Sequence, residues 1–319
     1  MLGHQRILAP HARPASLRSA SSAGPDYGSR DRPDWREVRW PTHLRAMTID
    51  GRRVHFAEIG SGDGAPILLI HGLGGRWQNW LENIPRLAAQ RRVVAVDLPG
   101  FGHSQLPLEP ISIAGYARVL DRACDLLELD AAIVVGNSLG GAVATEMALR
   151  HPARVRRLVL VAPAGLEPGQ LSPQGAKLAL AAVGRIRAAL PNGLSGTLAR
   201  PRARHLALAT LLRHPTLIAS DTLAELTGGG RGRGSRAALA ALTAHDSHAE
   251  LDKISAQTLI IHGRNDMLIP CEASERLASR IPAAELVIFE DTGHMPMLER
   301  PVPFNDELLR FADGEAQPA

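Results

Sequence analysis

The sequence contains only two cysteines and 3% aromatic residues among its 319 positions, and it has no apolar run long enough to cross a membrane. Cys124 and Cys271 lie far apart and have no metal-ligand spacing. We therefore expect reduced packing residues rather than a disulfide or a metal site. The first 24 residues also lack the continuous apolar block of a secretory signal. These absences predict a cytoplasmic protein with no metal and no stable membrane insertion.

Basic charge is concentrated at the N-terminus. Residues 1–45 hold eight arginines and four acidic residues, a balance of +4 that equals the net charge of the whole chain. Because the rest is formally neutral, we expect no nucleic-acid partner. The composition of residues 1–45 predicts a flexible basic arm, which could serve a partner, a membrane surface or neither. The sequence does not indicate the oligomeric state. A transit peptide has a similar composition, but Pro10 and Pro14 disfavour its amphipathic helix.

Short apolar runs alternate with helical patterns along most of the chain. These runs cover residues 66–70, 93–96, 132–135, 158–161, 258–261 and 286–289. Wholly apolar strands are typical of a parallel sheet that is buried on both faces. The sequence therefore predicts an α/β fold with a mostly parallel twisted sheet flanked by helices.

The alternation stops between residues 162 and 250. Four helical patterns follow one another there without a strand, at residues 175–190, 198–212, 216–226 and 236–244. We expect a helical insertion over residues 163–250, between the two parts of an α/β core at 46–162 and 251–319. The glycine-rich run Gly228–Gly234 predicts a hinge or mobile loop rather than a phosphate site, because no strand precedes it.

Ser138 stands between glycines, directly after one apolar strand and before a helical pattern. This is the pattern of a nucleophile elbow, in which a sharp turn exposes the serine hydroxyl. We expect Gly136, Gly140 and Gly141 to remove side chains that would crowd the turn. The motif alone is weak, since small residues also serve ordinary helix packing, but its strand-then-helix setting favours catalysis.

A serine nucleophile needs a base, and the base needs a group that orients it. Asp266 and His294 each follow one of the last two predicted strands, at the sheet edge where Ser138 is expected. Ordinary roles exist for both, a turn residue or helix cap for the aspartate and a solvated loop residue for the histidine. Their shared edge favours a Ser-Asp-His triad, with Asp246 and Asp291 as weaker candidates for the acid.

Acyl transfer also needs hydrogen-bond donors for the oxyanion that forms when the serine attacks. The segment His71–Gly75 immediately follows the apolar strand at residues 66–70. We expect the backbone N–H groups of Leu73 and Leu139 to form the oxyanion hole, although an ordinary glycine turn would explain the segment in isolation.

Taken together, these residues resemble the α/β-hydrolase-fold superfamily over roughly residues 47–313. The resemblance rests on Ser138, Asp266 and His294 in that order, on the loop at residues 71–75 and on the segment at residues 97–104. It implies a serine hydrolase without a cofactor, in which the helical insertion forms a cap over the serine.

The same resemblance implies a substrate pocket between cap and core. Gly72, Asn137 and Trp77 are its candidate substrate-binding residues, with Trp80 as a further candidate wall. For each tryptophan, ordinary packing is the alternative.

The nucleophile and loop residues separate branches of this superfamily. Haloalkane dehalogenases and soluble epoxide hydrolases carry aspartate at the position of Ser138, which disfavours both. Carbon–carbon hydrolases of the meta-cleavage type often share Gly-Asn-Ser-x-Gly-Gly, but they tend to have proline at the position of Gly75 and tryptophan at that of Met295. We therefore expect a carboxylesterase or lipase-like enzyme that hydrolyses a small-molecule ester through an acyl-enzyme on Ser138. A carbon–carbon hydrolase is the alternative, and a non-catalytic binding protein on the same fold is less favoured.

Overall fold

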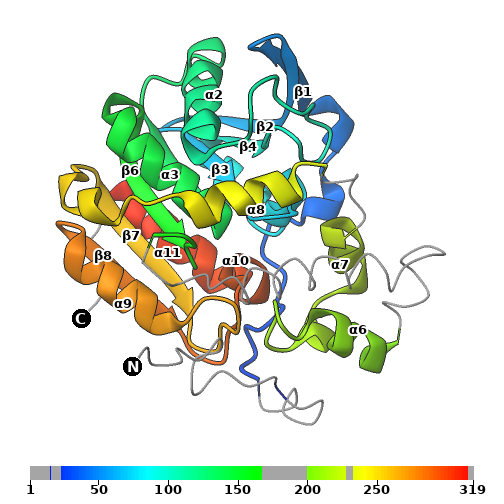
Figure 1. Ribbon diagram of the computed structural model, residues 1–319. Coiled ribbons are helices and arrows are strands. Elements are labelled where there is room, and N and C mark those ends of the chain that lie inside the picture. Colours follow the sequence, from blue (N-terminus) through cyan, green and yellow to red (C-terminus); the bar gives the residue numbers. More distant parts are fainter. Residues whose placement is uncertain (1–14, 16–22, 167–199, 228–232, 315–319) are drawn as a thin grey trace.

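The computed structural model describes residues 15, 23–166, 200–227 and 233–314. Its strands form one eight-stranded sheet in the order β1-β2-β4-β3-β5-β6-β7-β8 (Figure 1). The strands are β1 (Leu44–Ile49), β2 (Arg52–Asp63), β3 (Ile67–Ile70), β4 (Arg91–Asp97), β5 (Ala132–Asn137), β6 (Val155–Val161), β7 (Gln257–Gly263) and β8 (Ala284–Phe289).

Only the β1 edge of the sheet is antiparallel. β2 pairs antiparallel with both β1 and β4, whereas the other neighbouring strands are parallel. β1 and β2 are joined by Asp50 and Gly51, whose φ angles of 50° and 71° are both positive. A two-residue type I′ hairpin turn requires this conformation. The predicted mostly parallel sheet is therefore confirmed.

The central strands are buried on both faces, as their uninterrupted apolar sequences predict. In β3, Leu68 and Ile70 belong to one hydrophobic core while Ile67 and Leu69 belong to the other. Successive side chains of a strand point to opposite faces, so every side chain of a strand between two cores is buried and apolar.

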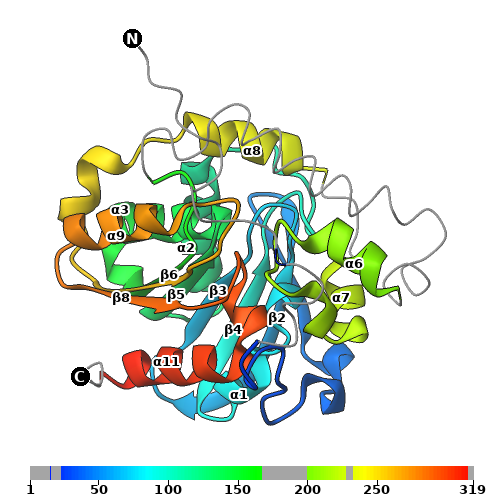
Figure 2. The same ribbon diagram turned by 90° about the horizontal axis from the view of Figure 1, so that it is seen from below.

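Helices cover both of these faces (Figure 2). The first core lies under α2 (Ile113–Leu126), α3 (Leu139–Arg150) and α9 (Cys271–Arg280), and the second under α1 (Ile84–Ala88), α10 (Pro296–Glu299) and α11 (Pro301–Asp313). Short 3₁₀ helices lie at Trp35–Glu37, Trp40–Thr42, Trp77–Trp80, Pro152–Arg154, Pro215–Leu217 and His248–Lys253.

Three described helices lie between β6 and β7, within the predicted insertion. They are α6 (Pro201–Leu208), α7 (Ser220–Thr227) and α8 (Ser235–Ala244). Leu208 and Leu223 pack into the second core, whereas Ala238 and Leu242 pack into the first. The helices of the insertion therefore pack against the hydrophobic cores on both faces of the sheet. The predicted helix at 175–190 and most of the glycine-rich run lie outside the described residues.

The second half of the predicted flexible arm differs from the prediction. Tyr27 is only 6% exposed, Trp35 donates its indole N–H to Glu82 Oε1 over 2.9 Å, and the Trp40 ring lies 4.8 Å from that of Trp77. A few aromatic side chains anchor a segment because each buries a large area, an effect that mean composition does not register. Residues 1–14 and 16–22 lie outside the described part.

Cys124 and Cys271 are both free thiols with buried side chains, as predicted. Burial raises the pKa of each thiol to about 11. Within the described ranges, no cluster of His, Cys, Asp or Glu is suited to hold a metal ion. No helix in those ranges is long and apolar enough to span a bilayer.

Candidate active site

Ser138 forms the turn between β5 and α3. Its φ of 54° and ψ of −115° lie in a region that residues with a side chain rarely occupy. The turn is fixed by backbone bonds: Ser138 N–H donates to Val161 O over 3.0 Å, and Ser138 O accepts from Gly141 and Ala164 over 2.9 and 3.1 Å. The surrounding backbone therefore compensates for the strain.

The three glycines around the serine are required by close backbone approach. A Cβ at Gly136 would lie 2.1 Å from Gly140 O, and one at Gly140 would lie 2.3 Å from Ile70 O. A Cβ at Gly141 would lie 2.8 Å from the Pro163 side chain. The prediction that these glycines relieve crowding is confirmed.

His294 and Asp266 are hydrogen-bonded, as the predicted triad requires. The His294 Nδ1 atom lies 2.6 Å from Asp266 Oδ2, and both side chains are buried. A carboxylate only accepts hydrogen bonds, so Nδ1 carries the proton in this contact and Nε2 is the ring nitrogen that can act as the base. Asp266 Oδ1 is held by the backbone N–H groups of Leu268 and Ile269 over 2.7 and 3.0 Å. This fixed carboxylate orients the imidazole.

A second imidazole, His262, also faces the carboxylate and was missed by the sequence analysis. Its Nε2 lies 3.2 Å from Asp266 Oδ2, and its Nδ1 lies 2.6 Å from Ser274 Oγ. Burial raises the pKa of Asp266, but charge and hydrogen bonds from His294 and His262 outweigh burial and lower it well below the ordinary value. Asp266 is thus ionised at neutral pH. The four-residue spacing of His262 and Asp266 is the signal that could have revealed this pair.

The histidine loop lies against the elbow. Asn137, next to the serine, directs its side-chain N–H₂ to Val161 O over 3.1 Å and to His294 O over 3.5 Å. Asn137, predicted to bind substrate, thus has its amide engaged by the protein. Among the described residues no hydrogen bond joins the Ser138 hydroxyl to the His294 ring, and such bonds are often long in enzymes without substrate.

The loop after β3 also approaches the serine. A Cβ at Gly72 would lie 3.0 Å from Asn137 Oδ1 and 3.2 Å from Ser138 Cβ. Gly72 O is held within its own loop, by Gly75 N–H over 3.0 Å and by His71 Nδ1 over 2.7 Å. His71 Nε2 accepts from Leu98 N–H over 3.0 Å, so Nδ1 carries the ring proton. Burial lowers the pKa of His71, which keeps this ring neutral.

The two predicted oxyanion donors are both available. In the described part of the chain, neither Leu73 N–H nor Leu139 N–H has a hydrogen-bond acceptor. For Leu139 this follows from its position as the first residue of α3, where helix N–H groups have no partner within the helix. The trans peptide between Gly72 and Leu73 points the Leu73 N–H away from the bonded Gly72 carbonyl. Unpaired donors beside a nucleophile are what an oxyanion hole needs.

Trp77 and Trp80 lie in the second hydrophobic core. Trp77 is 4% exposed and packs against Trp40, while Trp80 is fully buried near Phe304. The Trp77 backbone N–H donates to the buried Asp97 carboxylate over 2.9 Å. Both indoles therefore serve packing in this structure.

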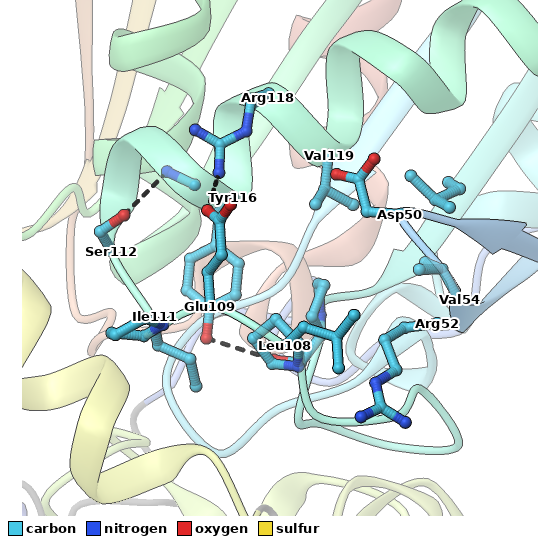
Figure 3. A pocket seen from close by; sticks show the side chains of 15 residues that line it. Asp50, Arg52, Val54, Leu108, Glu109, Ile111, Ser112, Tyr116, Arg118 and Val119 are labelled. Carbon is cyan, nitrogen blue, oxygen red and sulfur yellow. Dashed lines mark hydrogen bonds and ion pairs between the residues drawn. The ribbon is translucent and has the colours of Figure 1, made fainter.

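A separate hollow lies between the β1–β2 hairpin and α2, as Figure 3 shows, and none of the predicted site residues lines it. Ile49, Val54 and Val119 form apolar walls, and the Tyr116 hydroxyl donates to Pro99 O over 3.3 Å. The hollow encloses about 110 Å³. It offers a place for control substitutions outside the predicted site.

Comparison with known protein families identifies the family of this chain. The family model described as the alpha/beta hydrolase fold matches residues 65–301. The chain belongs to this family. It is an α/β hydrolase enzyme, and the predicted superfamily is confirmed.

Relatives with named activities indicate which reaction is favoured within the family. The chain is 35% identical over 281 residues to a 2-hydroxymuconate semialdehyde hydrolase of Pseudomonas sp. (strain CF600), covering 80% of this chain and 90% of that protein. It is 32% identical to a 2-hydroxy-6-oxo-2,4-heptadienoate hydrolase of Pseudomonas putida, covering 80% and 91%. A solved meta-cleavage product hydrolase from Pseudomonas fluorescens IP01 has a TM-score of 0.68 at 26% identity, covering 85% of this chain and 97% of that one. These relatives favour the carbon–carbon alternative over the predicted ester hydrolase.

Proposed function

We propose that this protein is a serine-dependent carbon–carbon hydrolase acting on a vinylogous diketone of the kind formed by meta ring cleavage. The observation that carries the proposal is the 35% identity to a 2-hydroxymuconate semialdehyde hydrolase over most of both chains. The hydrogen-bonded Asp266–His294 pair beside the strained Ser138 turn supports it.

The proposed roles follow from the positions of the groups. His294 takes the proton of Ser138, whose oxygen attacks the substrate carbonyl, and Asp266 holds the imidazole in place. The N–H groups of Leu73 and Leu139 receive the negative charge on the oxyanion. Gly72 and Asn137 shape the floor of the substrate site through their contacts with the elbow. We treat residues 163–250 as the cap and 46–162 with 251–319 as the core.

Breaking a carbon–carbon bond makes an extra demand. The leaving carbon must carry an electron pair, and a vinylogous carbonyl can delocalise that pair onto a distant oxygen. The proton that His294 removed is then available for the oxygen of the resulting dienolate, while water releases the acyl group through the same base. The net reaction adds water across the bond, giving a carboxylic acid and a dienol.

Ester hydrolysis by the same serine is the second candidate, favoured by Gly75 and Met295. Gly75 donates its N–H to Gly72 O over 3.0 Å, and proline, found at that position in many carbon–carbon hydrolases, has no N–H to give. The loop here is therefore built differently at this point. The Gly72 carbonyl that accepts from Gly75 points away from the Leu73 N–H of the same peptide group. The presence of glycine instead of proline at residue 75 therefore leaves the proposed oxyanion donor in place.

The test compares two substrates in one preparation. Loss of the visible absorbance of 2-hydroxymuconate semialdehyde is followed beside release of p-nitrophenol from short p-nitrophenyl esters, for the wild type and Ser138→Ala. We expect a higher kcat/KM for the ring-fission compound and loss of both activities in the variant. Turnover of esters alone would reject the carbon–carbon proposal in favour of the second candidate, and turnover by Ser138→Ala would reject the nucleophile.

A further inference from the structure

Glu299 is a fully buried carboxylate five residues after the candidate base His294. Its Oε1 accepts from Gly293 N–H over 3.0 Å and from Met295 N–H over 3.1 Å. Its Oε2 accepts from Arg213 N–H over 2.7 Å and from the Tyr27 hydroxyl over 2.5 Å. All of these partners are donors, which is the arrangement that a carboxylate, acceptor-only, can satisfy. Burial raises the pKa of Glu299, and the bonds from these four donors act in the opposite direction.

The amides that Glu299 holds are those immediately before and after His294. The remaining amide of the three, His294 N–H, donates to Leu211 O in the insertion over 2.9 Å. Three successive backbone positions are therefore fixed from outside the loop. With Nδ1 bonded to Asp266, the imidazole keeps little freedom to change its position.

Two other segments of the chain meet at the same carboxylate. Tyr27 donates to Glu299 and accepts from His214 N–H over 2.7 Å, so its hydroxyl joins the N-terminal segment to the insertion. Gly28 N–H also donates to Glu299 O over 2.7 Å. Burial first, and then the Glu299 charge, raise the pKa of Tyr27 well above its ordinary value, so the hydroxyl stays a donor.

The insertion also binds the histidine loop through Asp291. Arg213 Nε lies 2.9 Å from Asp291 Oδ1, and His214 Nε2 lies 2.7 Å from Asp291 Oδ2. Asp291 was one of the two weaker candidates for the catalytic acid, and its carboxylate is instead engaged by these two residues. Burial raises the pKa of Asp291, but bonds and charge from Arg213 and His214 outweigh burial and lower it.

We propose that Glu299 is the positioning residue of the catalytic histidine loop, and that the Tyr27–Glu299 contact couples the N-terminal segment and the insertion to His294. The inference rests on the proposed function, because it takes His294 as the base. Acting through backbone amides, Glu299 determines where the imidazole lies without touching substrate.

Two substitutions test this without removing bulk. Glu299→Gln replaces one of the two carboxylate acceptors with an N–H₂ donor. In one orientation of the side-chain amide this donor faces the loop amides, and in the other it faces the Tyr27 and Arg213 donors. Tyr27→Phe removes the hydroxyl and leaves the bonds to Gly293 and Met295 untouched. The matched controls are Glu146→Gln, at a buried carboxylate of α3, and Tyr116→Phe, at the buried tyrosine of the separate hollow.

The expected result is a loss confined to turnover. Misplacement of a catalytic group by about 1 Å can cost about 100-fold, so we expect Glu299→Gln to lower kcat by about 10- to 100-fold with KM changed less than about twofold. Tyr27→Phe should lower kcat by a smaller factor, and both controls should keep the wild-type kcat. Glu299→Asp, which keeps the charge, should recover part of the loss. A kcat within about twofold of wild type in both Glu299→Gln and Tyr27→Phe would overturn the proposal.

A spectroscopic measurement separates this inference from the proposed function. The Nδ1 proton of His294, bonded to Asp266, should give a downfield proton NMR signal that shifts or broadens in Glu299→Gln and Tyr27→Phe but not in the controls. This holds whether or not the wild type cleaves the ring-fission compound. An unchanged signal in both variants would contradict positioning by Glu299. If Glu299→Gln does not fold, the Tyr27→Phe signal and kcat decide.

Discussion

Gly72→Ala tests the contact between the loop after β3 and the nucleophile. The backbone of Gly72 does not have the positive φ that excludes side chains, so alanine fits its conformation. The new Cβ would lie 3.0 Å from Asn137 Oδ1 and 3.2 Å from Ser138 Cβ, a few tenths of an ångström too close for both. Because these atoms belong to the rigid elbow, the loop should move away and carry the Leu73 N–H with it.

The magnitude follows from what that N–H contributes. Complete loss of one oxyanion donor costs about 10²- to 10³-fold in kcat, so a displacement of a few tenths of an ångström should cost about 10-fold, or about 1.4 kcal/mol of transition-state binding. Stability should change by less than about 1 kcal/mol, since the smaller entropy of the unfolded alanine chain offsets the crowding. Activity and stability should therefore separate.

Gly115→Ala is the matched control. There a Cβ would lie 2.9 Å from Ser112 Oγ, a similar contact with a side-chain oxygen, but in α2. Both variants are compared by urea unfolding and by steady-state kinetics on the ring-fission substrate. A Gly72→Ala enzyme with wild-type kcat would refute the placement of the loop, as would an equal loss of kcat in Gly115→Ala.

Three further outcomes are expected. Burial raises the pKa of Asp266, but the two neighbouring imidazoles outweigh burial and lower it. The ionised carboxylate therefore adds to the free energy of unfolding above about pH 4, and this contribution is lost as the pH falls. Asp266→Asn should lower kcat by about 10⁴-fold, and its deficit in unfolding free energy should shrink below about pH 4. Cys124 and Cys271, with thiol pKa values raised to about 11, should react with a thiol reagent at pH 8 far more slowly in the native than in the urea-unfolded protein. Gly140→Ala should fail to accumulate as folded protein, because its Cβ would lie 2.3 Å from the Ile70 backbone oxygen.

The sequence predicts the sheet and the strand-end residues because both follow from local patterns. Wholly apolar runs such as residues 67–70 become strands buried on two faces, and the carboxyl ends of parallel strands bring Ser138, Asp266 and His294 to one edge. The glycines of the elbow are equally predictable from the sequence, since a strained turn between strand and helix leaves no room for side chains.

Contacts between distant segments were not predictable in the same way. Nothing near Tyr27 in the sequence indicates that its hydroxyl bonds to Glu299, 272 positions away. Charge counts, which set the predicted arm boundary at residue 45, likewise do not register single buried aromatic anchors such as Tyr27. The ester preference rested on Gly75 and Met295, two positions outside the elbow, and the similarity to a 2-hydroxymuconate semialdehyde hydrolase over 80% of this chain favours the carbon–carbon reaction instead.

The central claim is that Ser138 and its neighbours add water across a carbon–carbon bond. Reaction of 2-hydroxymuconate semialdehyde in oxygen-18 water, followed by mass spectrometry of the products, tests it most directly. We expect a dienol fragment and a carboxylic acid fragment that carries the heavy oxygen, with neither formed by Ser138→Ala. Recovery of the intact substrate from wild-type enzyme that still hydrolyses p-nitrophenyl esters would contradict it.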